Sequence, residues 1–319
     1  MIKSDNGSLH QVLKGFSINN RTIWAANRFW METENMKNKR YGGRSHNHWY
    51  LLLFLMKAFN TFLHLTRQYQ RGYNNAKDIV LREMDLSFPD LPKEFHGFTI
   101  LHLSDLHLDG IPCLEDIVLR QLDNREVDIC VLTGDYRAAL HGPMKQVMKS
   151  LETLVKGVNS RNGFLGILGN HDSCHMVEPM ERMGIRMLIN ENFHVERSGA
   201  SLQFIGTDDV HYYYTDQALH SMEAADDGFS IALVHSPELY DVAAEMGIDL
   251  YLCGHTHGGQ VCLPGGLPIL THVNRGRRFY KGHWRYKDLQ GITSLGIGAS
   301  VPVRFNTRGE VLILRLNKC

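Results

Sequence analysis

Short apolar runs that end in polar clusters dominate the chain from about Ile79 onward. The clearest of them read "FTILHLSDLH", "VDICVLTGDY", "FLGILGNHD", "LQFIGTDD", "FSIALVHSPE" and "IDLYLCGHTH". Each run has the length of a buried strand, and each closes on Asp, His, Asn or Gly. We therefore predict a series of strands whose carboxyl ends carry the polar side chains.

Helical stretches separate several of these runs, and we place them at residues 114–125, 143–158 and 237–246. Strands that alternate with helices are typical of an α/β layered fold. A strand-rich tail, with "GITSLGIGAS" and "EVLILRLN", would extend or close the sheet. In such folds ligands gather beyond the carboxyl ends of the strands. A functional site is therefore expected where the polar clusters fall.

The pattern is different in the first 78 residues. Residues 1–48 are polar and Asn-rich, with Lys and Arg outnumbering Asp and Glu, and we expect no secretory signal among them. We expect this segment to be poorly ordered. Residues 49–72 contain "WYLLLFLMKAFNTFLHLTRQYQR", which predicts a helix. Its polar positions Lys57, Asn60, Thr61 and His64 share one face and interrupt the run before about 20 apolar residues accumulate.

Three roles for this amphipathic helix remain open. Trp49 and Tyr69 bracket it and arginines flank it, which is typical of a helix lying in a membrane interface. It could instead pack on the main domain, or anchor the chain as a span that tolerates a few polar residues. The predicted organisation is thus a disordered segment, this helix and a catalytic domain over residues 79–319.

Composition narrows the choice of function. The 319 residues carry no formal net charge and the pI is about 7.3, whereas nucleic-acid binders usually show a basic excess. The six cysteines are scattered without a CxxC pair, which is typical of reduced thiols in a cytosol-like compartment. We expect a cytoplasmic protein, peripheral on the inner face of the cytoplasmic membrane if the helix binds lipid. Histidine is abundant, with 18 residues.

The polar residues at the predicted strand ends are rich in metal ligands. They are Asp105, His107, Asp135, Asn170, His171, Asp172, His235, His255 and His257. The candidate ligands among them are too many for one ion but suit two adjacent ions that share a carboxylate. Two cations about 3.5–4 Å apart can hold a phosphoryl oxygen and activate water.

These residues also carry a resemblance to a known family. D-x-H, G-D, G-N-H-D, a lone strand-end His and G-H-x-H are the signature blocks of the calcineurin-like metallophosphoesterases, which the chain resembles over residues 98–316. "GHTHGGQ" followed by "LP", and later "GIGASVPVRFN", resemble a bacterial branch of small phosphodiesterases that often carry an N-terminal membrane segment. That branch includes the chlamydial-type UDP-2,3-diacylglucosamine pyrophosphatase. The resemblance implies a β-sandwich flanked by helices.

The resemblance also implies a role for each residue of the site. The first metal would be held by Asp105, His107, Asp135 and His257. The second would be held by Asp135, Asn170, His235 and His255, with Asp135 as the bridge. His171 would donate a proton to the leaving group, with Asp172 orienting its ring, and water activated by the metals would be the nucleophile. Mixed His, Asp and Asn ligation fits Mn, Fe or Zn, among which the sequence does not choose.

Two arginines are candidates for binding substrate. Arg304, in "VPVRFN", matches an arginine that recurs in the family's late block, although "TRGE" here replaces the Pro-Glu that usually follows. Arg278 belongs to the basic segment 271–285, which is either a solvated loop or a wall that grips a second phosphate. His102, His194, His211 and His220 are interpreted as ordinary core or edge residues.

We therefore expect a dinuclear metal-dependent hydrolase of a phosphodiester or pyrophosphate. The favoured substrate is a lipid-linked nucleotide such as UDP-2,3-diacylglucosamine, an intermediate of lipid A synthesis, because the amphipathic helix would hold the site next to a membrane surface. The alternatives are a generic soluble phosphodiesterase or a nuclease, and no nucleic acid is expected as a partner because the pI is neutral. A non-catalytic metal-binding scaffold predicts a missing ligand or a missing proton donor, and the sequence lacks neither.

Overall fold

The computed structural model describes residues 20–41, 46–225, 227–299 and 301–319. Two compact units, Met1–Phe54 and Leu55–Cys319, divide the chain inside one helix, and each is described by itself. Each of the six cysteines lies in the described part and is a free thiol, as expected for reduced cysteines.

The first unit contains helix α2 (Asn20–Tyr41) and the start of α3 (His46–Leu65). Helix α2 differs from the expectation that residues 1–48 are poorly ordered. It contains neither Gly nor Pro, and the buried Arg28 pairs with Glu32 one turn later at 3.1 Å. Both features favour a helix even where no apolar pattern is evident. Residues 1–19 and 42–45 of that predicted segment lie outside the described residues.

The helix expected over residues 49–72 is divided in two. Helix α3 ends at Leu65 and α4 (Tyr69–Lys77) follows, because Arg67 adopts a left-handed conformation with a φ of 58°. On α3, Phe59, Phe62 and Leu65 are exposed. Among the helices of the described residues, none combines the length and the apolar character needed to cross a bilayer.

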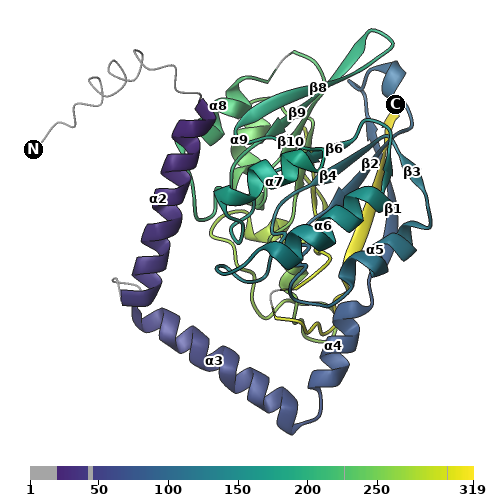
Figure 1. Ribbon diagram of the computed structural model, residues 1–319. Helices are drawn as coiled ribbons and strands as arrows, with labels where there is room; N and C mark the ends of the chain where they lie inside the picture. The colour runs from purple at the N-terminus through teal and green to yellow at the C-terminus, as the bar shows by residue number, and fades with distance from the viewer. Residues whose placement is uncertain (1–19, 42–45, 226, 300) are drawn as a thin grey trace, which may run out of the picture. The chain divides into compact units, whose positions relative to one another are not determined.

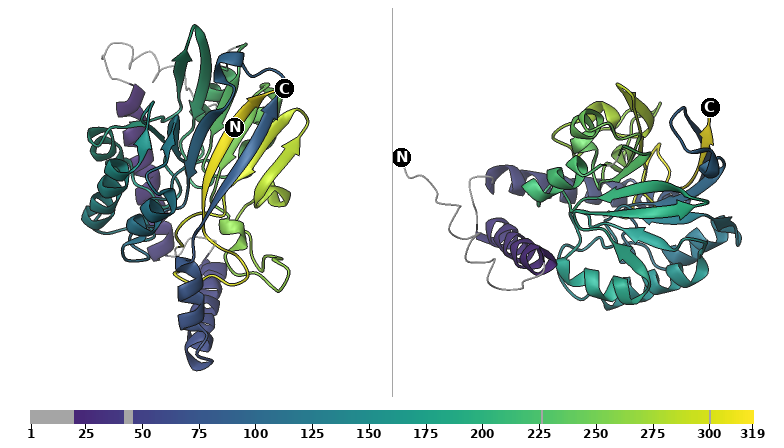
Figure 2. Two further views of the ribbon diagram at one scale, coloured as in Figure 1. Left: turned by 90° about the vertical axis from the view of Figure 1, so that its right-hand side faces the viewer. Right: turned by 90° about the horizontal axis from the view of Figure 1, so that it is seen from above.

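The second unit is built on two six-stranded sheets (Figures 1 and 2). In the first sheet the strand order is β1-β14-β2-β4-β6-β7, with only the β14–β2 pair antiparallel. Its strands are β1 (Val80–Phe88), β2 (Phe98–Leu103), β4 (Ile129–Leu132), β6 (Phe164–Gly166), β7 (Ile185–Met187) and β14 (Glu310–Lys318).

The second sheet has the order β12-β13-β11-β10-β9-β8 and is parallel in its four central strands. Its outer strands β12 and β8 pair antiparallel with their neighbours. Its strands are β8 (Glu191–Arg197), β9 (Ala200–Gly206), β10 (Ser230–Leu233), β11 (Leu250–Cys253), β12 (Gly282–Tyr286) and β13 (Leu289–Thr293). A separate two-stranded sheet joins β3 (Glu126–Val127) and β5 (Asn159–Ser160).

The main core lies between the two large sheets. Phe98 and Ile100 of β2 pack there with Ile231 of β10 and Leu250 of β11. The central strands are buried on both faces, and this is why they read in the sequence as continuous apolar runs rather than as alternating ones.

Helices cover the outer faces of both sheets (Figure 1). Helices α5 (Leu114–Leu122), α6 (Lys145–Gly157) and α7 (Val177–Arg182) lie on the first sheet, and α8 (Asp216–Glu223) and α9 (Tyr240–Glu245) on the second. Short 3-10 turns complete the unit: η1 (Lys93–Phe95), η2 (Cys174–Met176), η3 (Pro237–Leu239), η4 (His257–Gly259) and η5 (Arg277–Phe279). The predicted α/β fold, a layered β-sandwich flanked by helices, is confirmed.

Candidate metal centre

The loops that follow β2, β4, β6, β10 and β11 bring seven polar side chains to one end of the sandwich. The first three strands belong to the first sheet and the last two to the second, so the loops of both sheets meet here. All seven side chains have little contact with water. They are Asp105, His107, Asp135, Asn170, His235, His255 and His257.

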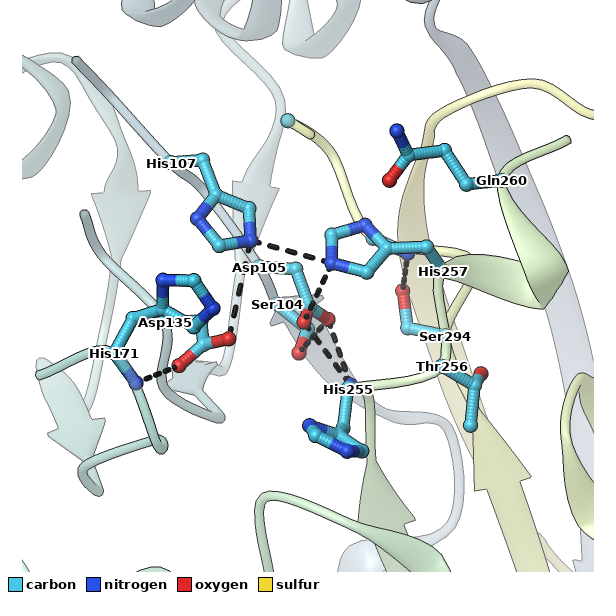
Figure 3. A network of polar contacts seen from close by, with 12 residues as sticks. Ser104, Asp105, His107, Asp135, His171, His255, Thr256, His257, Gln260 and Ser294 are labelled. Carbon is cyan, nitrogen blue, oxygen red and sulfur yellow. Dashed lines mark hydrogen bonds and ion pairs between the residues drawn. The ribbon is translucent and has the colours of Figure 1, made fainter. Parts of the chain in front are cut away.

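Three of these side chains form a first half-site, consisting of Asp105, His107 and His257 (Figure 3). The Nε2 atoms of the two imidazoles lie 3.2 Å apart. The Nε2 atom of His257 lies 3.5 Å from the carboxylate of Asp105. The three ligand atoms can therefore surround one small cation.

A second half-site consists of Asp135, His235 and His255. Nε2 of His235 lies 3.2 Å from Nδ1 of His255 and 3.3 Å from Oδ2 of Asp135. The same nitrogen lies 3.0 Å from the side-chain oxygen of Asn170, which brings a neutral ligand to this half-site.

One carboxylate oxygen connects the two half-sites. Oδ2 of Asp135 is 3.3 Å from Nε2 of His235 in the second half-site and 3.8 Å from Nε2 of His107 in the first. A single oxygen in contact with both sets of ligands is what a bridging carboxylate requires, and its charge would offset the repulsion between two cations.

Backbone carbonyl groups fix three of the imidazole rings from behind. Nδ1 of His107 donates to the carbonyl of Arg137 at 2.8 Å, and Nδ1 of His235 donates to that of Thr133 at 2.7 Å. Nε2 of His255 donates to the carbonyl of His272 at 2.6 Å. Each bond leaves the other ring nitrogen facing the centre, which is the arrangement that orients metal-binding histidines.

The facing nitrogens indicate how well the centre fits metal ions. Two neutral imidazoles whose lone pairs meet at 3.2 Å repel each other unless a cation or a proton lies between them. Burial lowers the pKa of His107 to about 4, and burial, with the neighbouring His107 and Arg304, lowers the pKa of His257, so the first half-site offers two neutral imidazoles beside the carboxyl group of Asp105. In the second half-site, burial disfavours the charged form of His235, but the carboxylates of Asp135, Asp105 and Asp209 outweigh burial and raise the pKa of His235 well above its ordinary value. His235 therefore carries a proton that a metal ion would replace.

The backbone at the ligands is strained. Asp105, His107, Asp135, His255 and His257 all have left-handed φ values, between 40° and 70°. Such conformations cost about 1–3 kcal/mol each for residues other than glycine and persist only where the surrounding structure imposes them. They turn the side chains back toward the end of the sandwich as soon as each strand stops.

Two glycines of the signature blocks allow the loops to come this close. A Cβ atom on Gly254 would lie 1.9 Å from Oγ of Ser104 and 2.2 Å from Oδ2 of Asp105. A Cβ atom on Gly169 would lie 2.3 Å from Oδ1 of Asp135. In "GHTH" and "GNHD" the glycine is therefore required by packing between loops.

His171 lies at the edge of the first half-site, with its ring 5.1 Å from that of His107. The structure differs from the expectation that Asp172 orients this ring, because Nδ1 of His171 bonds to the carbonyl of Ala138 at 2.8 Å. The buried carboxylate of Asp172 instead accepts backbone N–H groups of Asp135, Tyr136 and Gly169 at 2.7–2.9 Å. It joins the loops after β4 and β6.

Arg304 does not face substrate, contrary to our expectation. Its side chain is fully buried, and its guanidinium donates to the carbonyls of Leu295 and Gly298 at 2.8 and 2.7 Å and to that of His257 at 3.3 Å. Burial lowers its pKa to about 10, so it remains charged at neutral pH. A planar group with five donors suits a point where several carbonyl groups converge. Arg304 supports the loop of His257.

Arg278 is exposed and lies over aromatic rings. Its guanidinium carbon is 4.6 Å from the ring centre of Phe279 and 5.4 Å from that of Tyr286. Such stacking holds the cation in place at the surface. A role for Arg278 in binding substrate stays a prediction.

Three residues near the second half-site were missed by the sequence analysis: His211, Glu238 and His272. His211, interpreted as an ordinary core or edge residue, lies with its ring centre 4.4 Å from that of His255, and its Nδ1 bonds to Glu238 at 3.0 Å. His211, His255 and His272 form a further cluster whose ring nitrogens could hold a metal ion. The polar end of "IGTDDVH" was the available signal, because it too follows a strand.

The sequence is similar to those of known metallophosphoesterases. The family model described as calcineurin-like phosphoesterase matches residues 98–259, about half of the chain. The uncharacterized metallophosphoesterase YkoQ of Bacillus subtilis (strain 168) is 27% identical over 272 residues, which cover 82% of this chain and 97% of that protein. The uncharacterized metallophosphoesterase YkuE of the same organism is 28% identical over a match that covers 71% of this chain and 81% of that protein. The phosphodiesterase YaeI of Escherichia coli (strain K12) is 25% identical over a match that covers 69% of this chain and 82% of that protein.

Proposed function

The chain belongs to the calcineurin-like phosphoesterase family of metal-dependent phosphoester hydrolases, and we propose that it cleaves the phosphodiester or pyrophosphate bond of a lipid-linked nucleotide. UDP-2,3-diacylglucosamine, an intermediate of lipid A synthesis, is the specific substrate that we favour. The observation that carries the reaction type is the contact of a single oxygen of Asp135 with both half-sites.

We assign Asp105, His107 and His257 to one metal ion and Asn170, His235 and His255 to the other, with Asp135 as the bridge. The ring nitrogens that face the centre, and the carbonyl groups that hold the rings from behind, support this assignment. Nitrogen and oxygen ligation fits Mn, Fe and Zn alike, so the ligands do not select the metal. Manganese is the metal we would test first. When bound, two such ions polarise a phosphoryl oxygen and lower the pKa of water.

We assign proton donation to His171. Nδ1 donates to the carbonyl of Ala138, which leaves Nε2 as the nitrogen available to a leaving group. The backbone N–H of His171 bonds to Asp135 at 2.8 Å, which couples the position of the ring to the bridging carboxylate. Protonation of a leaving oxygen from this position is general acid catalysis, which is worth about 10²–10⁴-fold in rate.

The lipid part of the proposal rests on helix α3. Phe59, Phe62 and Leu65 expose their side chains on this helix, next to Arg67 and Arg71. Exposed aromatic and aliphatic groups beside basic residues suit a helix that lies at the surface of an anionic membrane, where a lipid-borne substrate would be found. We accordingly propose a peripheral membrane location for the protein.

The decisive measurement is turnover of UDP-2,3-diacylglucosamine by the full chain reconstituted with Mn, beside a chelated sample. We expect metal-dependent release of UMP, with most turnover lost in His171→Ala. A His194→Ala variant is the matched control, because His194 is exposed on β8 and belongs to none of the signature blocks.

Three other results would redirect the assignment. Hydrolysis of an aryl phosphodiester without release of UMP would keep the reaction type and discard the lipid-linked nucleotide in favour of a soluble diester. Cleavage of single-stranded DNA or RNA at a comparable rate would favour the nuclease alternative. Absence of any metal-dependent hydrolysis would leave the non-catalytic scaffold.

A further inference from the structure

The loop that follows the histidines of the metal centre exposes an unusual number of aliphatic side chains. Leu263, Leu267, Ile269 and Leu270 are 49%, 62%, 64% and 59% exposed, within eight consecutive residues. Single exposed aliphatic residues are common on protein surfaces, but a continuous group of them marks an interaction site.

This segment is a hydrogen-bonded hairpin, which we call the 263–270 hairpin. Across its turn, the backbone N–H of Leu263 donates to the carbonyl of Leu267 at 2.8 Å, and that of Ile269 donates to Val261 at 3.2 Å. Gly265 and Gly266 provide the positive φ values that the turn requires. The exposed side chains therefore stand on an ordered backbone, so little further ordering would be needed for binding.

Both ends of the hairpin are attached to the neighbourhood of the metal centre. Before it, η4 contains His257, and the N–H of Cys262 bonds to the carbonyl of Phe305 at 2.9 Å. After it comes His272, whose carbonyl accepts the bond from His255. The hairpin is therefore flanked in the chain by residues that carry or hold ligands of the metal centre.

The charge of the surrounding chain favours one kind of partner. Between Asp249 and Asp288 the sequence contains no acidic residue, but it contains Arg275, Arg277, Arg278, Lys281, Arg285 and Lys287. Lys281 lies against the hairpin itself, with Nζ 3.2 Å from the carbonyl of Gly266. A cavity of about 730 Å³ has Cys262 and Gly266 of this region in its wall, together with the basic Lys281, Arg82 and Arg308 and the acidic Asp78 and Glu310.

Aliphatic side chains beside basic ones match the chemistry of an anionic bilayer, where the former enter the acyl boundary and the latter meet the headgroups. We propose that the 263–270 hairpin docks the catalytic domain on an anionic lipid surface. The inference deepens the proposed function, on which it rests for a lipid-borne substrate, but it concerns a segment of the chain other than α3.

The test is partition of the full chain onto vesicles of phosphatidylcholine alone or of two parts phosphatidylcholine to one part phosphatidylglycerol. The double variant Leu267→Asp/Ile269→Asp is compared with Met246→Asp, which changes an exposed apolar residue (39% exposed) at the end of α9. We expect the double variant to bind the anionic vesicles about tenfold more weakly or worse, and the control to bind like the wild type.

A second measurement locates the hairpin at the membrane without weakening it. Brominated lipids should quench the additional fluorescence of Ile269→Trp but not that of Met246→Trp, with the native tryptophans as the common background. Equal quenching of the two variants, or unchanged partition of the double variant, would overturn the proposal. So would a wild-type dimer that the double variant converts to a monomer, because the hairpin would then be a surface between copies.

Failure of this inference is distinguishable from failure of the proposed function. Metal-dependent hydrolysis of a water-soluble aryl diester is measured on the same samples. Normal hydrolysis without vesicle binding rejects the hairpin as a docking surface and keeps the hydrolase. Vesicle binding that depends on the hairpin, without release of UMP from UDP-2,3-diacylglucosamine, keeps the docking surface and rejects the proposed substrate.

Discussion

The metal centre and the 263–270 hairpin are adjacent in the sequence but place their side chains in opposite environments. At the centre, polar groups are buried, and each imidazole held from behind has a backbone carbonyl as its partner. In the hairpin, aliphatic groups are exposed on a backbone whose own hydrogen bonds are made. Both arrangements are unfavourable for a chain in water, the first through strain and desolvation and the second through exposed apolar area.

The difference indicates which contacts would stabilise each region. The buried ligands would be stabilised by metal ions, since ions relieve the repulsion between facing nitrogens. The hairpin would be stabilised only by a surface outside the domain. Substitutions at the centre should therefore change metal content and chemistry, whereas those in the hairpin should change only where the domain binds.

The largest effect is expected for Asp135→Asn. Loss of the bridging charge affects both half-sites, so we expect binding of both metals to weaken by more than about 100-fold, the upper range for changes that only support a ligand. Metal content by mass spectrometry and turnover of an aryl diester measure the effect. Asp128→Asn is the control, because Asp128 is a buried carboxylate outside the centre that accepts bonds from Thr99. Full metal content in Asp135→Asn would remove the bridge from the site.

The next effect separates chemistry from metal binding. We expect His171→Ala to lower kcat by about 10²–10⁴-fold while both metals stay bound, because we assign this ring to the leaving group and not to the ions. The loss should be smaller for a diester whose leaving group needs no proton, such as a nitrophenolate. An equal loss for good and poor leaving groups would contradict proton donation.

Arg304→Met tests whether the centre depends on support from behind. Removal of a buried cation that serves several carbonyl groups should lower the free energy of unfolding by about 3–5 kcal/mol. It should also weaken metal binding at the first half-site, where Arg304 contacts the carbonyl of His257. Denaturant titration of the metal-free and metal-loaded chain measures both effects.

Arg308→Met is the matched control for this prediction. Its guanidinium is exposed and pairs with Asp78 at the surface, so its loss should cost at most about 1 kcal/mol. Equal destabilisation by the two variants would mean that Arg304 contributes no more than a surface ion pair.

The smallest effect lies away from both regions. Burial raises the pKa of Asp249 to about 6, above its ordinary value of 3.8, although its bond from the N–H of Ser230 opposes the rise. The folded protein therefore binds this proton more tightly than the unfolded chain, and stability falls as the pH rises from about 4 to 6.

Asp249→Asn should remove this dependence on pH. We expect a gain of about 1 kcal/mol at pH 7, where water screens the partly exposed carboxyl, and none at pH 4. Denaturation midpoints at the two pH values measure it, with the exposed Asp288→Asn as the control. A loss of stability at pH 7 would show that the bond to Ser230 outweighs the burial of charge.

Much of this architecture was predictable from local patterns. The apolar runs located the central strands, because a strand buried on both faces must be apolar along its whole length. The signature residues at the strand ends located the candidate ligands, because parallel strands in one sheet end at one edge. The break at Arg67 and the helix α2 were not predictable in this way, since neither follows from an apolar pattern.

The sequence by itself determined which residues can bind metal and that they follow strands, because ligand chemistry and strand burial are local properties of the side chains. Only the tertiary structure decided which oxygen bridges the half-sites, which carbonyl groups fix the rings of His107, His235 and His255, and that Arg304 supports a loop rather than facing substrate. The exposure of the 263–270 hairpin was decided in the same way. These features depend on distances between segments that lie far apart in the chain, and such distances are set when the two sheets pack together.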